Sequence, residues 1–274
     1  MTPELSHLQP DSCPVDAHVH LHRKADVGAT LDSAAANFAR VRGADTGLLG
    51  YLLLTQAAHE LVFEALEPGS SEGDWLLVRA EPQTLLARNG ERIIALVCGR
   101  QAQADDGLEV AALGTLERFD DGLPFGELLR AVMASDAVAA IPWGFGKWTG
   151  TRARRVAAEM ARQDPARYFL GDSGSRSWAG PEPALIRRAR AGGIRVLAGT
   201  DPFPFAGDFR RVASFGFVAE LEPDPEQPWA RLRSWLAAVR GSPRLYGRPA
   251  GPVRFLVNQL GVHVHNFVRH RKAE

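Results

Sequence analysis

Cysteine is scarce in this 274-residue chain, which contains only Cys13 and Cys98. Two cysteines provide no disulfide framework and indicate a reducing compartment. No apolar run approaches the roughly 20 residues of a membrane-spanning helix. The first residues, MTPELSHLQPDSCP, lack the basic and apolar regions of a secretory signal. These absences predict a cytoplasmic protein with no membrane partner.

The chain also lacks net charge, because 32 basic side chains balance 32 acidic ones. A neutral chain has no overall electrostatic attraction to a polyanion, so nucleic acid is not expected as a partner. Hydrophobic residues make up 45% of the chain, which is enough for a sizeable core. We find no repeat and no long linker, and we therefore expect a single domain.

Runs typical of strands alternate with runs typical of helices along most of the chain. The expected strands are 13–21, 46–55, 74–80, 91–99, 108–114, 137–143, 167–171 and 194–201. The expected helices are 32–43, 56–66, 124–135, 151–163, 181–193 and 229–241.

Such alternation implies parallel strands joined by right-handed crossovers. About seven such units fit a closed, TIM-like (β/α) barrel of seven or eight units over residues 13–220 better than an open sheet. Residues 221–274 are expected to form a helical extension that packs on the barrel.

Three histidines occupy alternate positions in the stretch VDAHVHLH, which covers residues 15–22. Side chains two residues apart in a strand point to the same face, so His18, His20 and His22 can converge if the strand persists. Apolar residues fill the positions between them, which indicates a buried strand whose imidazoles need partners. Neutral imidazoles are good ligands for zinc, iron or manganese. The alternative is a polar, exposed strand without a metal.

A carboxylate follows a second apolar strand in VLAGTDPFPFAGD, residues 196–208. Because barrel enzymes carry their active-site groups at the C-terminal ends of strands, Asp201 is the expected partner of the histidines. His59 and Asp172 also follow predicted strands and are further candidate ligands. For each of these three residues the alternative is an ordinary surface or turn position.

Basic side chains near the predicted barrel mouth suggest an anionic small-molecule substrate. Lys147 and Arg152 follow the strand at 137–143, and Arg176 follows a glycine-serine turn able to bind an anion. A second pair of alternate histidines, His263 and His265, lies beside the basic C-terminus, where we expect a structural or surface role.

Together these motifs resemble the PHP (polymerase and histidinol phosphatase) family of metal-dependent phosphoesterases and, more distantly, the amidohydrolase superfamily. The resemblance spans roughly residues 13–220. It implies that His18 and His20 form the opening HxH motif, that His59 takes the histidine position of the second motif, and that Asp201 belongs to the closing motif.

The chain departs from the PHP pattern at four ligand positions: three of them hold Gln101, Trp143 and Phe203, and the Asp that precedes the second-motif histidine is missing. The resemblance therefore implies one or two divalent ions (zinc, manganese or iron) rather than three. His18, His20 and Asp201 are the main ligands, with His59, Glu109 and Asp172 as additions.

The resulting hypothesis is a metal-dependent phosphoesterase whose metal activates water at the mouth of the barrel. Asp201 would also accept a proton, and Lys147 and Arg176 would hold an anionic group. Three alternatives stay open: a hydrolase of amides or cyclic amides, a catalytically silent barrel that binds or scaffolds, and an open α/β sheet without a metal.

Overall fold

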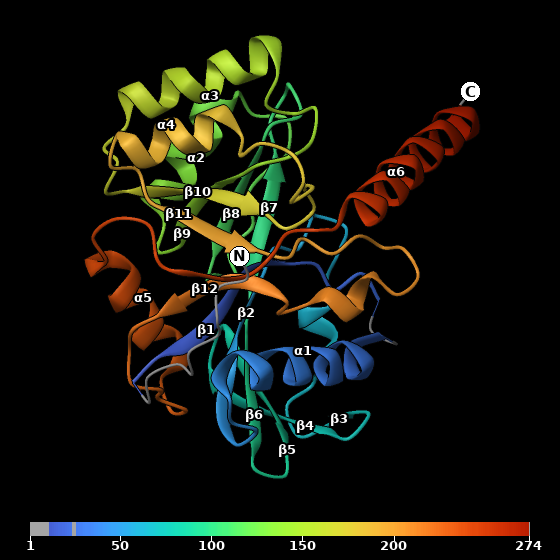
Figure 1. Ribbon diagram of the computed structural model, residues 1–274, viewed down its shortest axis with the longest axis vertical. Coiled ribbons are helices and arrows are strands. Elements are labelled where there is room, and N and C mark those ends of the chain that lie inside the picture. The colour runs from blue at the N-terminus through green and yellow to red at the C-terminus, as the bar shows by residue number, and fades with distance from the viewer. Residues whose placement is uncertain (1–10, 24–25, 274) are drawn as a thin grey trace.

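The computed structural model describes residues 11–23 and 26–273, and the side chains of its last helix up to residue 263. The strands form two sheets, one of eight strands and one of five (Figure 1). The larger sheet has the order β13-β12-β1-β2-β6-β5-β4-β3, and the smaller has the order β11-β10-β9-β8-β7. The strands of the larger sheet are β1 (Cys13–Val19), β2 (Gly47–Leu54), β3 (Ser71–Glu72), β4 (Trp75–Glu81), β5 (Thr84–Asn89), β6 (Arg92–Val97), β12 (Phe215–Ala219) and β13 (Leu245–Gly247). Those of the smaller sheet are β7 (Gly99–Gln103), β8 (Glu109–Leu113), β9 (Val138–Pro142), β10 (Tyr168–Ser173) and β11 (Val196–Gly199).

The predicted closed barrel is wrong. In the described part of the chain the strands belong to two separate sheets rather than one closed ring. Only part of the pairing is parallel: β1 pairs with β2, β2 with β6, and β10 with both β9 and β11. The strands β3 to β6 form an antiparallel ribbon, and so do β7, β8 and β9.

Short turns explain the antiparallel ribbon. Only Gly90 and Glu91 separate β5 from β6, and Gly90 has a φ of 57°. Two residues suffice for a hairpin, whereas a parallel crossover needs a dozen or more. The strand at Thr84–Asn89 was not predicted, although the pair Asn89-Gly90 is a typical hairpin sequence.

Most predicted helices are confirmed with small shifts at their ends. The observed helices are α1 (Val27–Arg42), α2 (Phe125–Ala134), α3 (Gly150–Arg162), α4 (Ala184–Ala191), α5 (Pro228–Ala238) and α6 (Pro252–Ala273). Gly43 ends α1 in the left-handed conformation and donates its N–H to the Ala39 carbonyl, as a C-terminal glycine usually does. Helices α2, α3 and α4 gather on the smaller sheet, whereas α1 lies on the larger one (Figure 1).

The predicted helix at 56–66 is wrong, because only the short 3-10 turn Phe63–Ala65 forms there. The backbone N–H of Phe63 donates to the side chain of Gln56 at 2.8 Å, and that of Ala57 donates to Glu60 at 3.3 Å. These bonds to side chains take the place of helical backbone bonds.

The two sheets meet along β1, β2, β7 and β11. An added Cβ at Gly99 would lie 2.3 Å from the Leu54 carbonyl oxygen, and one at Gly199 would lie 2.2 Å from the His18 nitrogen. Only glycine permits these two close approaches. One hydrophobic cluster contains residues of both sheets, including Tyr51 and Phe169, and fixes the junction where β1 ends.

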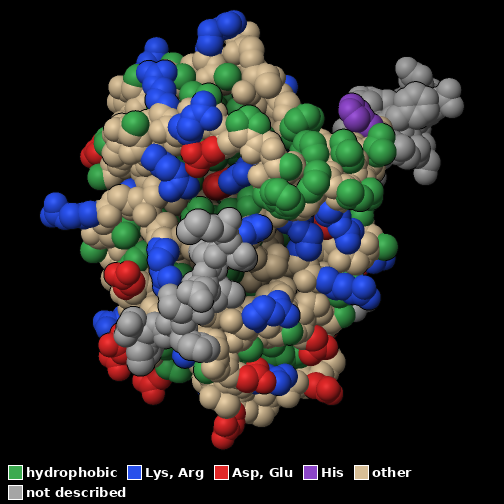
Figure 2. Space-filling model, viewed as in Figure 1, with side chains coloured by type: hydrophobic (Ala, Val, Ile, Leu, Met, Phe, Trp, Pro, Cys, Tyr) green, Lys and Arg blue, Asp and Glu red, His purple; other side chains and the backbone are tan. Residues whose placement is uncertain are grey.

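The region predicted as a C-terminal extension contributes more than helices. Strand β13 pairs with β12 at the edge of the larger sheet, and α6 extends away from the two sheets (Figure 1). Apolar side chains gather where α6 leaves the body (Figure 2), and they include Leu256 and Leu260, 59% and 65% exposed. None of the helices within the described residues has the length and apolar character needed to cross a membrane.

Candidate metal centre

His18 and His20 project from the end of β1 toward the same space. Their Nε2 atoms are 3.1 Å apart. Both side chains are nearly buried, with 9% and 11% of their surface exposed. The two-residue period of the strand brings these rings to one face, as the sequence predicts.

Asp201 lies opposite the two imidazoles, just after β11. Its Oδ1 atom is 3.6 Å from Nε2 of His18 and 3.8 Å from Nε2 of His20. Its backbone N–H donates to the His18 carbonyl at 2.8 Å, and its φ is 49°, in the left-handed region. Such a conformation is costly for a residue other than glycine and is often found at functional sites. His18, His20 and Asp201 therefore form a group that can bind a metal ion.

A second buried carboxylate, Asp16, fixes the distance between the ends of β1 and β11. It accepts hydrogen bonds from the backbone N–H of Thr200 at 2.8 Å, from the Thr200 hydroxyl at 2.5 Å and from the N–H of Ala213 at 2.9 Å. Burial raises the pKa of Asp16 to about 6, although these hydrogen bonds oppose the rise. Asp16 thus links β1, which carries His18, to Thr200, the residue directly before Asp201.

Glu60 is a part of the site that the sequence did not reveal. Its carboxylate accepts hydrogen bonds from Nδ1 of His20 at 3.1 Å and from Nδ1 of His22 at 2.7 Å. With its proton on Nδ1, His20 presents the Nε2 lone pair to the group. His22 also donates from Nε2 to the Pro202 carbonyl at 2.9 Å, so neither of its ring nitrogens is free to bind a metal.

The charges of the group favour an added cation. Burial lowers the pKa of His18 to about 4, despite the nearby Asp201 carboxylate. The pKa of His20 is raised, because the hydrogen bond to Glu60 and the charges of Asp201 and Glu60 outweigh burial. The pKa of Asp201 is lowered, since both imidazoles outweigh its burial. His18 is therefore a neutral ligand, and Asp201 an ionised one.

Two of the other predicted ligands do not belong to this group. His59 is exposed in the loop after β2. Asp172 is fully buried, and its two oxygens accept hydrogen bonds from Arg176 at 2.6 and 3.0 Å. The Arg176 guanidinium therefore faces a carboxylate of its own chain.

A cavity of about 240 Å³ opens in front of the group. Lys147 and Glu109 both line it and form an ion pair with each other. Its other polar lining residues are His18, His20, His22, Gln101, Ser175, Asp201 and Gln259. Its apolar lining residues are Pro142, Trp143, Phe145, Pro202, Phe203 and Val262. Three of the departures from the PHP pattern, Gln101, Trp143 and Phe203, thus line the same cavity.

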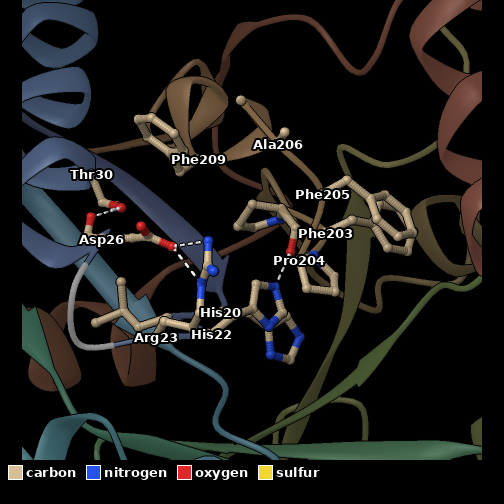
Figure 3. A pocket seen from close by; sticks show the side chains of 13 residues that line it. His20, His22, Arg23, Asp26, Thr30, Phe203, Pro204, Phe205, Ala206 and Phe209 are labelled. Atoms are coloured by element: carbon tan, nitrogen blue, oxygen red, sulfur yellow. Dashed lines mark hydrogen bonds and ion pairs between the residues drawn. The ribbon is translucent and has the colours of Figure 1, made fainter. Parts of the chain in front are cut away.

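A smaller pocket of about 60 Å³ adjoins the site (Figure 3). His20 and His22 line it together with Arg23 and residues 202–207. His22 donates from Nε2 to the backbone oxygen of Pro202, and this contact joins the histidine segment to the loop after Asp201. Of the second histidine pair, His263 is exposed on α6, and the His265 side chain is outside the described residues.

Neither a protein-family model nor a curated protein matches the chain. The solved structures that share its fold include PsfC and the endonuclease PfuEndoQ. PsfC from Pseudomonas syringae PB-5123 is 15% identical, with a TM-score of 0.52, and the match covers 91% of this chain and 97% of PsfC. The lesion-specific endonuclease PfuEndoQ from Pyrococcus furiosus is 13% identical, with a TM-score of 0.51, and the match covers 84% of this chain and 57% of the endonuclease. At such low identity the likeness concerns the fold alone.

Proposed function

We propose that this protein is a metal-dependent hydrolase that cleaves a phosphoester in the cavity before His18, His20 and Asp201. The observation that carries the proposal is the convergence of three donor atoms on one point beside an open cavity. The resemblance of the motifs to PHP phosphoesterases supports it. So does the fold shared with an endonuclease, an enzyme class that cleaves phosphodiesters.

The donor set fits a single divalent ion. Ligand atoms bound at about 2.0–2.1 Å around a tetrahedral ion lie about 3.4 Å apart. The three separations here are 3.1, 3.6 and 3.8 Å, so the side chains need little movement to bind zinc, manganese or iron. The hydrogen bond from His20 to Glu60 is the outer-sphere support that metal-binding histidines usually have.

The chain's own residues would supply the remaining chemistry. When bound, a divalent ion lowers the pKa of water and neutralises charge on a phosphate. Asp201 would hold the ion through Oδ1, and the same carboxylate, which lines the cavity and accepts a hydrogen bond from Ser173 through Oδ2 at 2.6 Å, would accept the proton of the attacking water. Lys147 would attract the negatively charged phosphate, with Glu109 fixing the position of its ammonium group.

Elemental analysis tests the metal. After reconstitution with Zn²⁺ or Mn²⁺ and removal of free ions, we expect about one ion per chain in the wild type and in the control His59→Ala. The double variant His18→Ala/His20→Ala should retain none. Equal retention in the double variant and the wild type would refute the assigned site.

An activity panel tests the reaction. The loaded wild type is given phosphomonoesters, phosphodiesters and cyclic amides. We expect phosphoester cleavage that disappears in the double variant. Cleavage of cyclic amides alone would favour the amidohydrolase alternative, and a loaded protein that cleaves nothing would favour a silent binding module.

A further inference from the structure

The apolar side of the cavity has no role in binding a phosphate or a metal. Trp143, Phe145 and Phe203 line the same cavity as the metal-binding group. A phosphate needs cations and N–H donors, which the polar side already provides. Large aromatic side chains around a cavity instead provide flat surfaces on which planar rings stack.

Two of these aromatic side chains, Phe203 and Phe145, pack against rings that do not line the cavity. Phe203 stacks on Phe205 with ring centres 5.6 Å apart and planes 15° apart. Phe145, which is 57% exposed, meets the edge of Phe255 at 5.1 Å and 80°. Rings fixed in this way lose little conformational freedom when a ligand stacks on them, which favours binding.

Two glutamine amides complement the aromatic rings. The Oε1 atom of Gln101 is buried in the wall of the cavity and has no hydrogen-bond partner among the described residues. The Gln259 amide lines the cavity from α6. An amide offers a donor and an acceptor side by side, the pattern needed to pair with the polar edge of a heteroaromatic ring.

We propose that this side of the cavity is a subsite for a planar heteroaromatic ring, so that the substrate is a phosphoester carrying a nucleobase or a ring of the same kind. The ring would stack on Trp143 and Phe203, with its edge facing Gln101 and Gln259. The identity of the substrate rests on the proposed phosphoesterase function, whereas ring binding by itself does not.

A binding experiment without turnover tests the subsite separately from the function. The double variant His18→Ala/His20→Ala is titrated with adenosine, cytidine and ribose, none of which carries a phosphate, by calorimetry. We expect saturable binding of at least one nucleoside and none of ribose. Phe203→Leu and Gln259→Leu, each added to the double variant, should weaken nucleoside binding about tenfold. Trp178→Leu is the matched control, because Trp178 is an exposed aromatic that does not line this cavity and should leave binding unchanged.

Activity then distinguishes the two sources of such a ring. The metal-loaded wild type is compared on adenosine and cytidine monophosphates, ribose 5-phosphate and a short single-stranded oligonucleotide. A kcat/KM at least tenfold higher for a nucleotide than for ribose 5-phosphate supports the subsite. The preferred substrate shows whether the ring arrives on a mononucleotide or within a strand.

The outcomes separate the two proposals. Nucleoside binding without any phosphoester cleavage supports the subsite and refutes the function. Nucleosides that bind no better than ribose, together with equal cleavage of nucleotides and ribose 5-phosphate, refute the subsite and leave the function standing. Nucleosides that bind no better than ribose in a protein without activity refute both.

Discussion

The carboxylate of Asp16 accepts hydrogen bonds from both the backbone N–H and the hydroxyl of Thr200, 184 residues later in the chain. Asp16 precedes His18 by two residues, and Thr200 precedes Asp201 directly. This pair therefore ties together the two segments that carry the metal-binding group, although neither residue belongs to the group.

We predict that Asp16→Ala destabilises the protein and empties the metal site. The substitution leaves the buried N–H groups of Thr200 and Ala213 without an acceptor, at a cost of about 2–4 kcal/mol. Urea unfolding followed by fluorescence measures the loss, and metal retention is measured on the folded fraction. The control is Asp74→Ala, at an exposed position. If Asp16→Ala lowers the free energy of unfolding by less than about 0.5 kcal/mol, Asp16 does not hold the two segments together.

Gly199→Ala should separate β11 from β1. The new Cβ would lie 2.2 Å from the backbone nitrogen of His18, so the strands must move apart and Asp201 with them. We expect a loss of about 3 kcal/mol or more in the free energy of unfolding, together with loss of metal binding. Gly180→Ala is the matched control, because an added Cβ there meets no atom closer than 3.6 Å. Normal metal affinity in Gly199→Ala would contradict the observed close approach.

Glu60→Gln should weaken metal binding while the protein stays folded. The amide retains the shape of Glu60 but removes the negative charge that holds the Nδ1 proton of His20. Loss of such an outer partner typically lowers metal affinity about 10- to 100-fold. Competition with a chelator of known affinity measures the change, and Glu67→Gln, at an exposed position, is the control. Unchanged affinity would mean that Glu60 does not orient His20.

Arg176 allows a test between a structural and a substrate-binding role. Arg176→Met leaves the buried Asp172 carboxylate without its partner, so we expect a loss of about 3–5 kcal/mol in stability. The double variant Asp172→Leu/Arg176→Met should recover most of that stability, and its KM should equal that of the wild type. A raised KM in the stable double variant would instead support the substrate role that the sequence suggested.

Both cysteines should resist thiol reagents at pH 8 until the protein unfolds. Burial raises the pKa of Cys13 to about 11 and that of Cys98 to about 12, and neither side chain is exposed. The reactive thiolate is therefore nearly absent in the folded state. Labelling with a chromogenic disulfide, before and after addition of urea, gives the measurement. Native labelling as fast as that of the unfolded chain would contradict the prediction.

The same pKa values predict how the two thiols affect stability at high pH. Their folded-state values lie above the unfolded value of 9.0, so above pH 9 the unfolded chain releases protons that the folded chain retains. Their contribution to stability is complete below pH 9 and is lost as the pH rises toward 11 and 12. Unfolding curves between pH 8 and 11 test this, with Cys13→Ala/Cys98→Ala expected to show a shallower decline.

Local sequence predicted the elements whose signals are local. The period of two around His18 and His20, and the glycine that ends α1, depend on neighbouring residues and appear as expected. The architecture was mispredicted at the hairpins, since the strand at Thr84–Asn89 lies between turns of about two residues that leave no room for a crossover helix. Without that strand, the segments on either side of it resemble parallel strands of a barrel, although they belong to an antiparallel ribbon.

By itself the sequence determined that two imidazoles share one face at the end of a buried strand and that a carboxylate follows another. Only the tertiary structure decided which side chains form hydrogen bonds and ion pairs with these imidazoles and carboxylates. Glu60 reaches His20 across 40 residues, and Asp172 is engaged by Arg176 rather than by the metal-binding group. The reason is physical: strand and helix periods set the direction of a side chain within its own element, whereas its partners depend on how the two sheets pack. That packing rests on contacts such as Gly199 against His18, which no local pattern reports.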